Sequence, residues 1–182
     1  VPQLILMQMS VCDERGAGGT ETHRIIQEII PLSRRDQLEY LKFIDEAYRP
    51  AVQEALKFLT DYDIEVIDTE RVVWLPDLKV AGTIDGIGMR GGNVVIWDWK
   101  TSASVYWETA LQLGAYSHLL TKLTGEVVYE AFAVRLPRAG DMGGAEVKRL
   151  STAGVHLAWD AYLSSLYLKQ ASGETWWEDT DA

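Results

Sequence analysis

The sequence predicts an α/β fold, described more broadly as α+β, with a mixed central β-sheet and helices on both faces. Segments with helical periodicity alternate with short β-branched and aromatic segments, in the order helix, three strands, helix, two strands, helix. No internal repeat or linker divides the 182 residues. We therefore expect one domain over residues 1–182, with an N-terminal arm at 1–19 and an acidic tail at 171–182.

Two helical segments are expected after the arm. Thr20 or Thr22 can cap a helix that runs through His23 to Ile30, which places His23 in its first turn. Residues 36–61 form the second segment, which Pro50 is expected to split in two. Its apolar residues have the spacing of a core-facing stripe: Leu38, Leu41, Phe43, Ile44, Val52, Ala55, Leu56 and Leu59.

A strand is expected at 64–75, followed by a β-hairpin over residues 80–101. Gly91, Gly92 and Asn93 tolerate positive φ and form its turn. Its second arm, residues 94–101, is β-branched and aromatic, which is typical of a central strand. The hairpin brings the end of this arm beside the start of the first one.

The hairpin contains charges on an otherwise apolar strand. Asp98 and Lys100 share one face, because side chains alternate along a strand, and the turn can bring Asp85 beside Asp98. Two adjacent carboxylates repel each other, and a divalent cation such as Mg²⁺ removes that repulsion. The pattern suits metal-assisted phosphodiester hydrolysis. The alternative is an exposed cross-strand ion pair, with Asp85 and Gly86 in ordinary turn chemistry.

The remaining elements follow in order. A helix is expected from about residue 105 to 123, with Gly125 at its C-terminal cap and with Gln112 and Tyr116 on one face. A strand at 126–136 and an edge strand at 145–150 follow, and an amphipathic helix at 152–170 completes the domain.

Four short motifs occur together in the chain. They are Gly19-Thr20-x-x-His23, Gly82-x-x-Asp85, Asp98-x-Lys100-Thr101 and Gln112-x-x-x-Tyr116. In this order they resemble the RecB-like exonuclease branch of the PD-(D/E)XK nuclease superfamily. The resemblance implies a restriction-endonuclease-like core, which agrees with the predicted order of elements.

The resemblance also implies a metal site. Asp85 and Asp98 are expected to bind Mg²⁺ or Mn²⁺, helped by His23 and the backbone carbonyl of Trp99. An imidazole ligand suits Mn²⁺ better than Mg²⁺. An acidic residue often lies on the strand before the hairpin in relatives, so Glu70 is open to two interpretations. It either assists the metal or pairs with a nearby lysine or arginine.

The resemblance assigns Lys100 to positioning of the attacking water. Gln112 and Tyr116 are expected to support the site or touch the DNA backbone, unless Tyr116 is only a core aromatic. We therefore expect a metal-dependent deoxyribonuclease. The expected activity is an exonuclease on DNA ends, in recombination, repair or phage DNA processing. The alternatives are a structure-specific endonuclease of the same superfamily and a non-catalytic acidic interaction protein that mimics DNA.

The charge balance limits how the chain can bind DNA. A formal net charge of −10 argues against tight, non-specific binding without metal or a protein partner that loads DNA. Cys12 is the only cysteine, which fits a reducing compartment, so a cytoplasmic, bacterial or phage-encoded protein is expected. No apolar run is long enough to span a membrane, so no membrane partner is expected.

Overall fold

The computed structural model of the chain describes residues 17–172, so most of the predicted arm and tail lies outside the described residues. In order, the elements are α1 (Ala17–Ile29), α2 (Arg34–Phe43), α3 (Arg49–Asp61), β1 (Glu65–Leu75), a short 3-10 helix η1 (Pro76–Leu78), β2 (Val80–Arg90), β3 (Asn93–Lys100), α4 (Glu108–Thr124), β4 (Val128–Arg135), β5 (Glu146–Leu150) and α5 (Thr152–Ser172). The expected order of helices and strands is confirmed.

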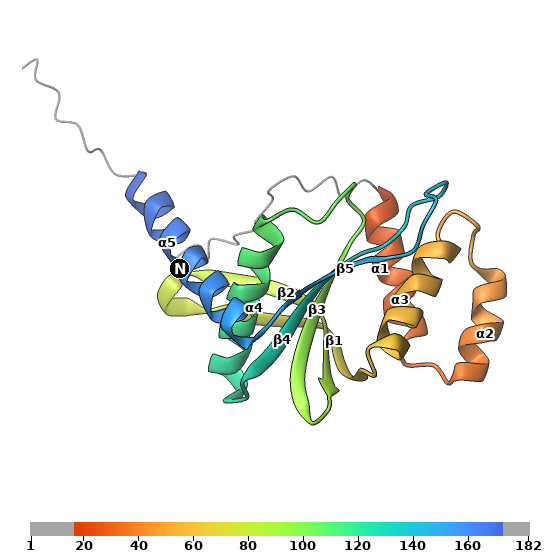
Figure 1. Ribbon diagram of the computed structural model, residues 1–182, viewed down its shortest axis with the longest axis horizontal. Helices are drawn as coiled ribbons and strands as arrows, with labels where there is room; N and C mark the ends of the chain where they lie inside the picture. Colours follow the sequence, from red (N-terminus) through yellow and green to blue (C-terminus); the bar gives the residue numbers. More distant parts are fainter. Residues whose placement is uncertain (1–16, 173–182) are drawn as a thin grey trace, which may run out of the picture.

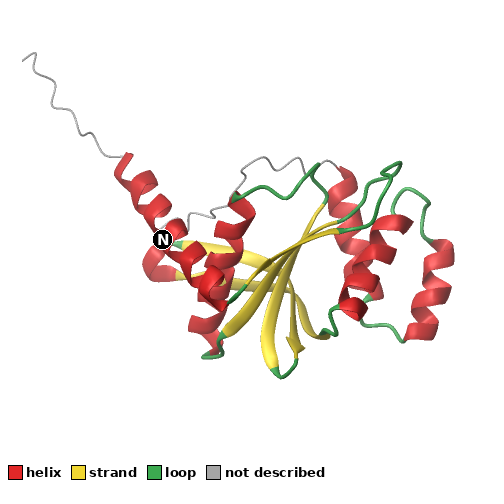
Figure 2. Ribbon diagram, in the orientation of Figure 1, coloured by secondary structure: helices red, strands yellow, loops and turns green. Residues whose placement is uncertain are grey.

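The strands form one sheet of five, in the order β1-β2-β3-β4-β5. Only β3 and β4 are parallel, and the other neighbouring pairs are antiparallel. Helices α4 and α5 cover one face, while α1 and α3 cover the other and α2 lies on the outer side of α3 (Figures 1 and 2). The mixed sheet with helices on both faces therefore agrees with the prediction.

The β2–β3 hairpin turns through Gly91 and Gly92, which have φ angles of 55° and 80°. Both lie in the left-handed region that a two-residue hairpin turn of this kind requires and that glycine adopts without steric cost. The paired residues Arg90 and Asn93 flank the turn directly. This tight turn fixes the register of the hairpin and hence the relative positions of the charged residues on its two arms.

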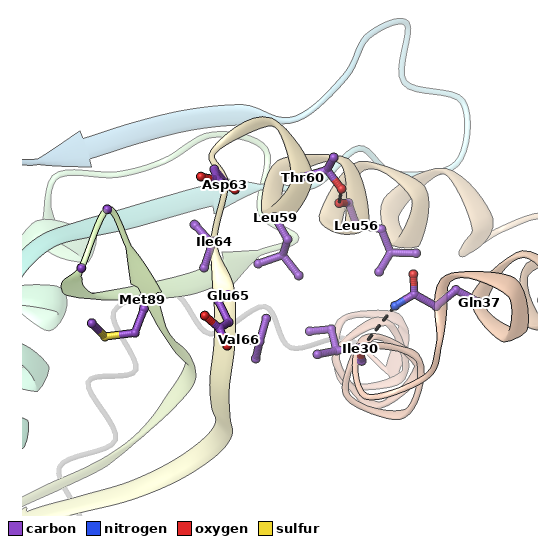
Figure 3. A pocket seen from close by; sticks show the side chains of 12 residues that line it. Ile30, Gln37, Leu56, Leu59, Thr60, Asp63, Ile64, Glu65, Val66 and Met89 are labelled. Carbon is purple, nitrogen blue, oxygen red and sulfur yellow. Dashed lines mark hydrogen bonds between the residues drawn. The ribbon is translucent and has the colours of Figure 1, made fainter.

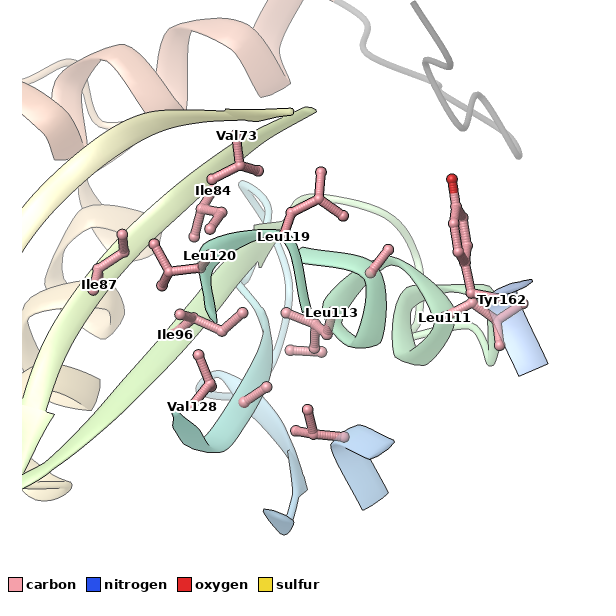
Figure 4. Close-up of a cluster of buried hydrophobic side chains, with 14 of the residues drawn as sticks. Val73, Ile84, Ile87, Ile96, Leu111, Leu113, Leu119, Leu120, Val128 and Tyr162 are labelled. Atoms are coloured by element: carbon pink, nitrogen blue, oxygen red, sulfur yellow. The ribbon is translucent and has the colours of Figure 1, made fainter. Parts of the chain in front are cut away.

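The sheet separates two hydrophobic cores, because successive side chains of the central strand β3 point to opposite faces. Trp97 is fully buried among the side chains of α1 and α3, and Ile96 is fully buried on the opposite side. The core beneath α4 is drawn in Figure 4 and includes Val73, Ile84, Ile87, Ile96, Leu113, Leu119 and Val128. Burial on both faces makes β3 the most enclosed strand of the sheet.

Helices α4 and α5 approach each other closely at Gly114. A methyl group at this position would lie 2.5 Å from the backbone nitrogen of Trp159 and 2.7 Å from the side chain of Ala158. Only glycine fits such a contact without displacing a helix. The contact holds α5 against the outer side of α4, and thereby fixes the helix that contributes Gln112 and Tyr116.

Two expectations about the N-terminal helices are wrong. Helix α1 begins at Ala17, so His23 lies in its second turn, and Thr22 is buried within the helix. Leu38 and Phe43 of α2 do not face a core, since they are 58% and 87% exposed, whereas Leu41 of the same helix packs against the core beside α1 and α3. The expected break near Pro50 is confirmed, because this residue lies in the first turn of α3, where its missing N–H costs no hydrogen bond.

Candidate functional site

The central strands β2 and β3 pair over only part of their length. Their pairing ends at Gly86 and Trp97, although β2 stays paired with β1 as far as Val80, and β3 stays paired with β4 as far as Lys100. The two strands therefore separate beyond Trp97. The opening admits polar side chains that a continuous sheet would exclude, because both faces of these strands are otherwise covered.

Asp85 directly precedes the last paired residue of β2, and its carboxylate lies in this opening. Its Oδ2 atom accepts a hydrogen bond from the backbone N–H of Trp99, with an N···O distance of 2.7 Å. Burial raises the pKa of Asp85 well above its usual range, and the negative charges of Asp98 and Glu70 raise it further. The Trp99 N–H and the Lys100 ammonium act in the opposite direction. Asp85 is thus a buried carboxylate that needs positive charge beside it.

Asp98 and Lys100 lie on the α4 side of the sheet, as the alternation along β3 predicts. Asp98 is only 3% exposed, and Lys100 Nζ lies 2.7 Å from its Oδ2 atom. This contact is an ion pair without hydrogen-bond geometry, so the buried Oδ2 makes no hydrogen bond to any residue between 17 and 172. An oxygen of this kind is costly to bury unless a further cationic or donor group binds it.

A chain of hydrogen bonds connects Lys100 to helix α4. Lys100 Nζ donates to Gln112 Oε1 at 2.9 Å, and Gln112 Nε2 donates to the Tyr116 hydroxyl oxygen at 2.9 Å. Because the amide nitrogen of Gln112 is held by Tyr116, its oxygen is oriented toward the lysine. Burial and the nearby charge of Asp98 raise the pKa of Tyr116, so its hydroxyl keeps its proton at neutral pH. These two hydrogen bonds fix the position of Gln112 relative to Lys100.

Gly82 makes this arrangement sterically feasible. A methyl group at its position would lie 2.4 Å from the Cε1 atom of Tyr116 and 3.0 Å from the Tyr116 hydroxyl oxygen. The ring of Tyr116 therefore packs directly on the backbone of β2. The glycine of the Gly82-x-x-Asp85 motif thus allows the tyrosine of the helix motif to reach the sheet.

His23 on α1 and Glu70 on β1 both lie near the carboxylate of Asp85. His23 Nδ1 lies 3.7 Å from Asp85 Oδ2, and one donor atom from each of His23, Glu70 and Asp85 lies within 4.8 Å of the others. Glu70 has a φ angle of 54°, which is unusual for a residue other than glycine. Its neighbours Thr69 and Arg71 pair with Gly86 and Ile84, so it falls opposite Asp85.

The residues present fit a divalent cation. Imidazole nitrogen and carboxylate oxygens are ligands that Mn²⁺ accepts, and carboxylate oxygens suit Mg²⁺. The raised pKa of Asp85 and the buried oxygen of Asp98 without a hydrogen bond both indicate unbalanced negative charge. A cation beside these groups would remove the imbalance. Asp98 is not among the donors within 4.8 Å of one another, so its part in binding the metal stays a prediction.

The structure brings the residues expected from the four motifs into one connected group. Asp85 contacts both His23 and Trp99, while the Asp98–Lys100 pair continues through Gln112 to Tyr116. The contact of Trp99 runs through its N–H, and the expected role of its carbonyl stays a prediction. Glu70 joins the group, and the sequence had left its role open. The matching signal is the register of β1 against β2, since a turn at 76–79 brings position 70 opposite position 85.

One cavity lies away from the motif residues. It has a volume of about 470 Å³ and lies among α1, α2, α3 and the start of β1, where Ile30, Leu56, Leu59 and Ile64 form much of its wall (Figure 3). Within it, Gln37 Nε2 donates to the carbonyl oxygens of Ile29 and Ile30, at 3.2 and 3.3 Å. None of the motif residues lines it. The functional candidate is therefore the opening in the sheet.

The chain belongs to the PD-(D/E)XK nuclease superfamily, whose family pattern it matches over residues 11–179. It is thus a nuclease of a family that uses divalent metal ions. Among curated proteins, none matches the chain by sequence. Within the part of the chain that the structure describes, none of the helices is both long enough and apolar enough to cross a membrane.

Two solved structures are similar in outline. One is an alkaline exonuclease from Laribacter hongkongensis, with 14% identity and a TM-score of 0.33, over 84% of this chain and 92% of that chain. The other was solved as SSO0001, with 14% identity and a TM-score of 0.35, over 82% of this chain and 87% of that chain. At these TM-scores the likenesses carry no argument about the site, and the membership rests on the family match.

Proposed function

We propose that this nuclease is a metal-dependent deoxyribonuclease that acts as an exonuclease on DNA ends. The observation that carries the proposal is the buried Asp98, held beside Lys100 at 2.7 Å next to the Asp85 carboxylate in the opening of the sheet. This arrangement combines a cation-binding carboxylate group with a positioned ammonium, as phosphodiester hydrolysis needs. The proposal covers residues 1–182 as one nuclease domain.

The cation would be Mg²⁺ or Mn²⁺, and Asp85, Asp98, His23, Glu70 and the carbonyl oxygen of Trp99 would hold it. Its chemistry would be to polarise the scissile phosphate and to lower the pKa of a water molecule. The Trp99 N–H donates to Asp85 Oδ2 and thereby fixes the orientation of this carboxylate. Asp85 must lose its proton to bind, and the positive charge of Lys100 favours that loss.

Lys100 acts on water and phosphate. Its ammonium carries three donors, of which Gln112 accepts one, and its charge lies beside the pair of carboxylates. The remaining N–H groups can orient the attacking water and stabilise the negative charge that develops on the phosphate. Gln112 and Tyr116 are positioning residues, because they fix the direction in which Lys100 extends.

The exonuclease mode rests on the resemblance of the helix motif, and an endonuclease of the same superfamily is the alternative. A DNA mimic is less well supported, since mimicry has no need for a buried carboxylate beside a lysine, such as Asp98 beside Lys100. DNA ends occur during recombination, repair and phage DNA processing, and we place the protein in the cytoplasm, where these processes run. A partner that loads DNA would compensate for the acidic net charge.

The test compares linear DNA with covalently closed DNA in Mn²⁺, using the wild type and Lys100→Ala. We expect wild-type protein to degrade linear DNA only, and the variant to lose about 10²–10³-fold in kcat, the size seen when one stabilising donor is removed. Calorimetry with Mn²⁺ should show metal binding retained. Lys42→Ala is the matched control, because this exposed lysine on α2 lies outside the site and should leave activity unchanged. An active Lys100→Ala protein would refute the assignment, and cleavage of closed DNA would favour the endonuclease.

A further inference from the structure

Two large aromatic side chains lie exposed on the loop that follows Lys100. Tyr106 is 52% exposed and Trp107 is 70% exposed. They end the loop of residues 101–107, which connects Lys100 at the end of β3 to the start of α4 (Figure 1). Exposed tryptophan is unfavourable in water, because it forgoes the burial of a large apolar surface. Two such side chains at one site edge therefore suggest a ligand with an apolar, planar face.

The loop is held in place by cationic side chains from β4, from β5 and from the connection between these strands. Arg135 Nε donates to the carbonyl oxygen of Ser102 at 3.2 Å, and Lys148 Nζ donates to the carbonyl oxygen of Val105 at 3.0 Å. Arg138 Nε donates to the carbonyl oxygen of Thr101. A loop fixed at three points presents its side chains with little loss of conformational freedom when a ligand binds.

The aromatic pair lies close along the chain to residues of the proposed site. Trp107 caps α4, and Gln112, which accepts the hydrogen bond from Lys100, follows five residues later. A rise of 1.5 Å per residue places Trp107 about 7.5 Å from Gln112 along the helix axis. The aromatic pair therefore lies within two helical turns of the residue that contacts Lys100.

The positively charged side chains near the loop favour a negatively charged ligand. Arg135, Arg138 and Lys148 lie behind the loop. Arg135 pairs with Asp141 and Lys148 pairs with Glu146, whereas Arg138 makes no ion pair with any residue in 17–172. The cations therefore exceed their carboxylate partners, and in a chain with a net charge of −10 this local positive charge suits a phosphate backbone. An aromatic face next to such a backbone path is the arrangement that single-stranded nucleic acid favours.

We propose that Tyr106 and Trp107 form a stacking platform for unpaired nucleobases of the strand being cleaved. The inference rests on the proposed deoxyribonuclease function and specifies its substrate as a strand with unpaired bases near the scissile phosphate. Bases inside a duplex already stack on their neighbours and have no free face to offer. The platform therefore selects frayed ends and single strands over closed duplex.

The test measures kcat/KM in Mn²⁺ on end-labelled single-stranded oligonucleotides, intact or with one abasic nucleotide at successive positions. We expect Trp107→Ala to lower kcat/KM on the intact strand by about tenfold or more, as removal of base stacking does. The kcat/KM of the wild type should fall by a similar factor when the abasic nucleotide occupies the stacking position. On that abasic strand, Trp107→Ala should have the same kcat/KM as the wild type. Trp107→Phe should keep most of the activity on the intact strand.

The matched control is Tyr167→Ala, since Tyr167 is 55% exposed on α5, outside the site. It should cleave every substrate as the wild type does. The inference is overturned if Trp107→Ala cleaves the intact strand as the wild type does, and the exposed aromatic pair would then be assigned to a protein partner. It is also overturned if the substitution lowers kcat/KM by the same factor on the abasic strand as on the intact strand. An inactive wild type would overturn the proposed function itself, so the two failures are distinguishable.

Discussion

At the scale of single residues, the buried carboxylate of Asp85 makes the fold sensitive to pH. The pKa of Asp85 is raised above its ordinary value in the folded protein, chiefly by burial. The folded state therefore holds this proton more tightly than the unfolded chain does. Below the unfolded pKa of about 4 the carboxyl is neutral in both states, and no cost arises. As pH rises through the folded pKa, the ionised form destabilises the metal-free fold.

We therefore expect Asp85→Asn to raise the melting temperature of the protein in EDTA at neutral pH, by about 2–4 °C for each kcal/mol of relieved repulsion. Asparagine keeps the shape of the side chain and an oxygen that can accept the Trp99 N–H. This increase in melting temperature should vanish below about pH 4, where wild-type Asp85 is protonated in both the folded and the unfolded state. Scanning calorimetry at several pH values measures it, with the exposed Asp77→Asn as a control that should not shift. A lower melting temperature for Asp85→Asn at neutral pH would contradict this account.

The sequence predicts part of this site, because hairpin geometry is local. A two-residue turn fixes the register, so Asp85 and Asp98 must be neighbours, and the alternation along β3 puts Lys100 on the same face as Asp98. The register of β1 against β2 brings Glu70 opposite Asp85, but the backbone conformation of Glu70 was not predictable. Its positive φ angle is unusual for a residue other than glycine, and no sequence signal marks it.

At the scale of elements, contact between β2 and α4 depends on Gly82. We expect Gly82→Ala to lower both stability and activity, because the new methyl group displaces the Tyr116 ring and, through Gln112, the lysine contact. Overpacking of this kind costs about 1–3 kcal/mol. Urea denaturation and cleavage rates measure the two effects.

The matched control for this prediction is Gly143→Ala, since a methyl group at Gly143 would meet no atom within 4 Å. It should change neither stability nor rate. The double variant Gly82→Ala/Tyr116→Leu should recover stability relative to Gly82→Ala, because the smaller side chain leaves room for the methyl group. Recovery of stability without recovery of activity would support the positioning role of Tyr116, whereas full stability of Gly82→Ala alone would contradict the proposed packing.

The strands and the covering helices were predictable because periodicity and turn chemistry agree in these segments. Helix α2 was the exception. Its apolar residues recur at core spacing, yet Leu38 and Phe43 are exposed, since α3 lies between α2 and the sheet (Figure 1). Periodicity indicates which face of a helix is apolar, but it does not indicate which of two adjacent helices forms the outer layer.

At the scale of the whole molecule, acidity sets the conditions for binding DNA. With a net charge of −10 and carboxylates converging on the opening of the sheet, the metal-free site should repel phosphate. Repulsion from distant charges is screened beyond about 8 Å at physiological salt, but the site charges are closer than that. A bound divalent cation reverses the local sign and can accept a phosphate oxygen.

We therefore expect DNA binding to require divalent metal even where cleavage is blocked. Ca²⁺ should support binding with little hydrolysis, because its looser coordination orients water poorly. Fluorescence anisotropy with an end-labelled oligonucleotide measures this in EDTA, in Ca²⁺, and in Ca²⁺ with Asp85→Asn. Tight binding in EDTA at physiological salt would contradict the charge argument. Failure of Ca²⁺ to promote binding would indicate that another protein supplies the grip on DNA.

The left-handed backbone conformation of Glu70 lowers the stability of the fold, although its side chain is expected to serve the metal site. A side chain in this conformation costs about 1–2 kcal/mol, and glycine would avoid most of that cost. We expect Glu70→Gly to be more stable than Glu70→Ala by about 1 kcal/mol in urea denaturation, while both bind Mn²⁺ less tightly in calorimetry. Equal stability of the two variants would show that the backbone is unstrained. If the difference is found, any search for thermostable variants will favour glycine at this position, and the most heat-resistant proteins it yields will be the poorest nucleases.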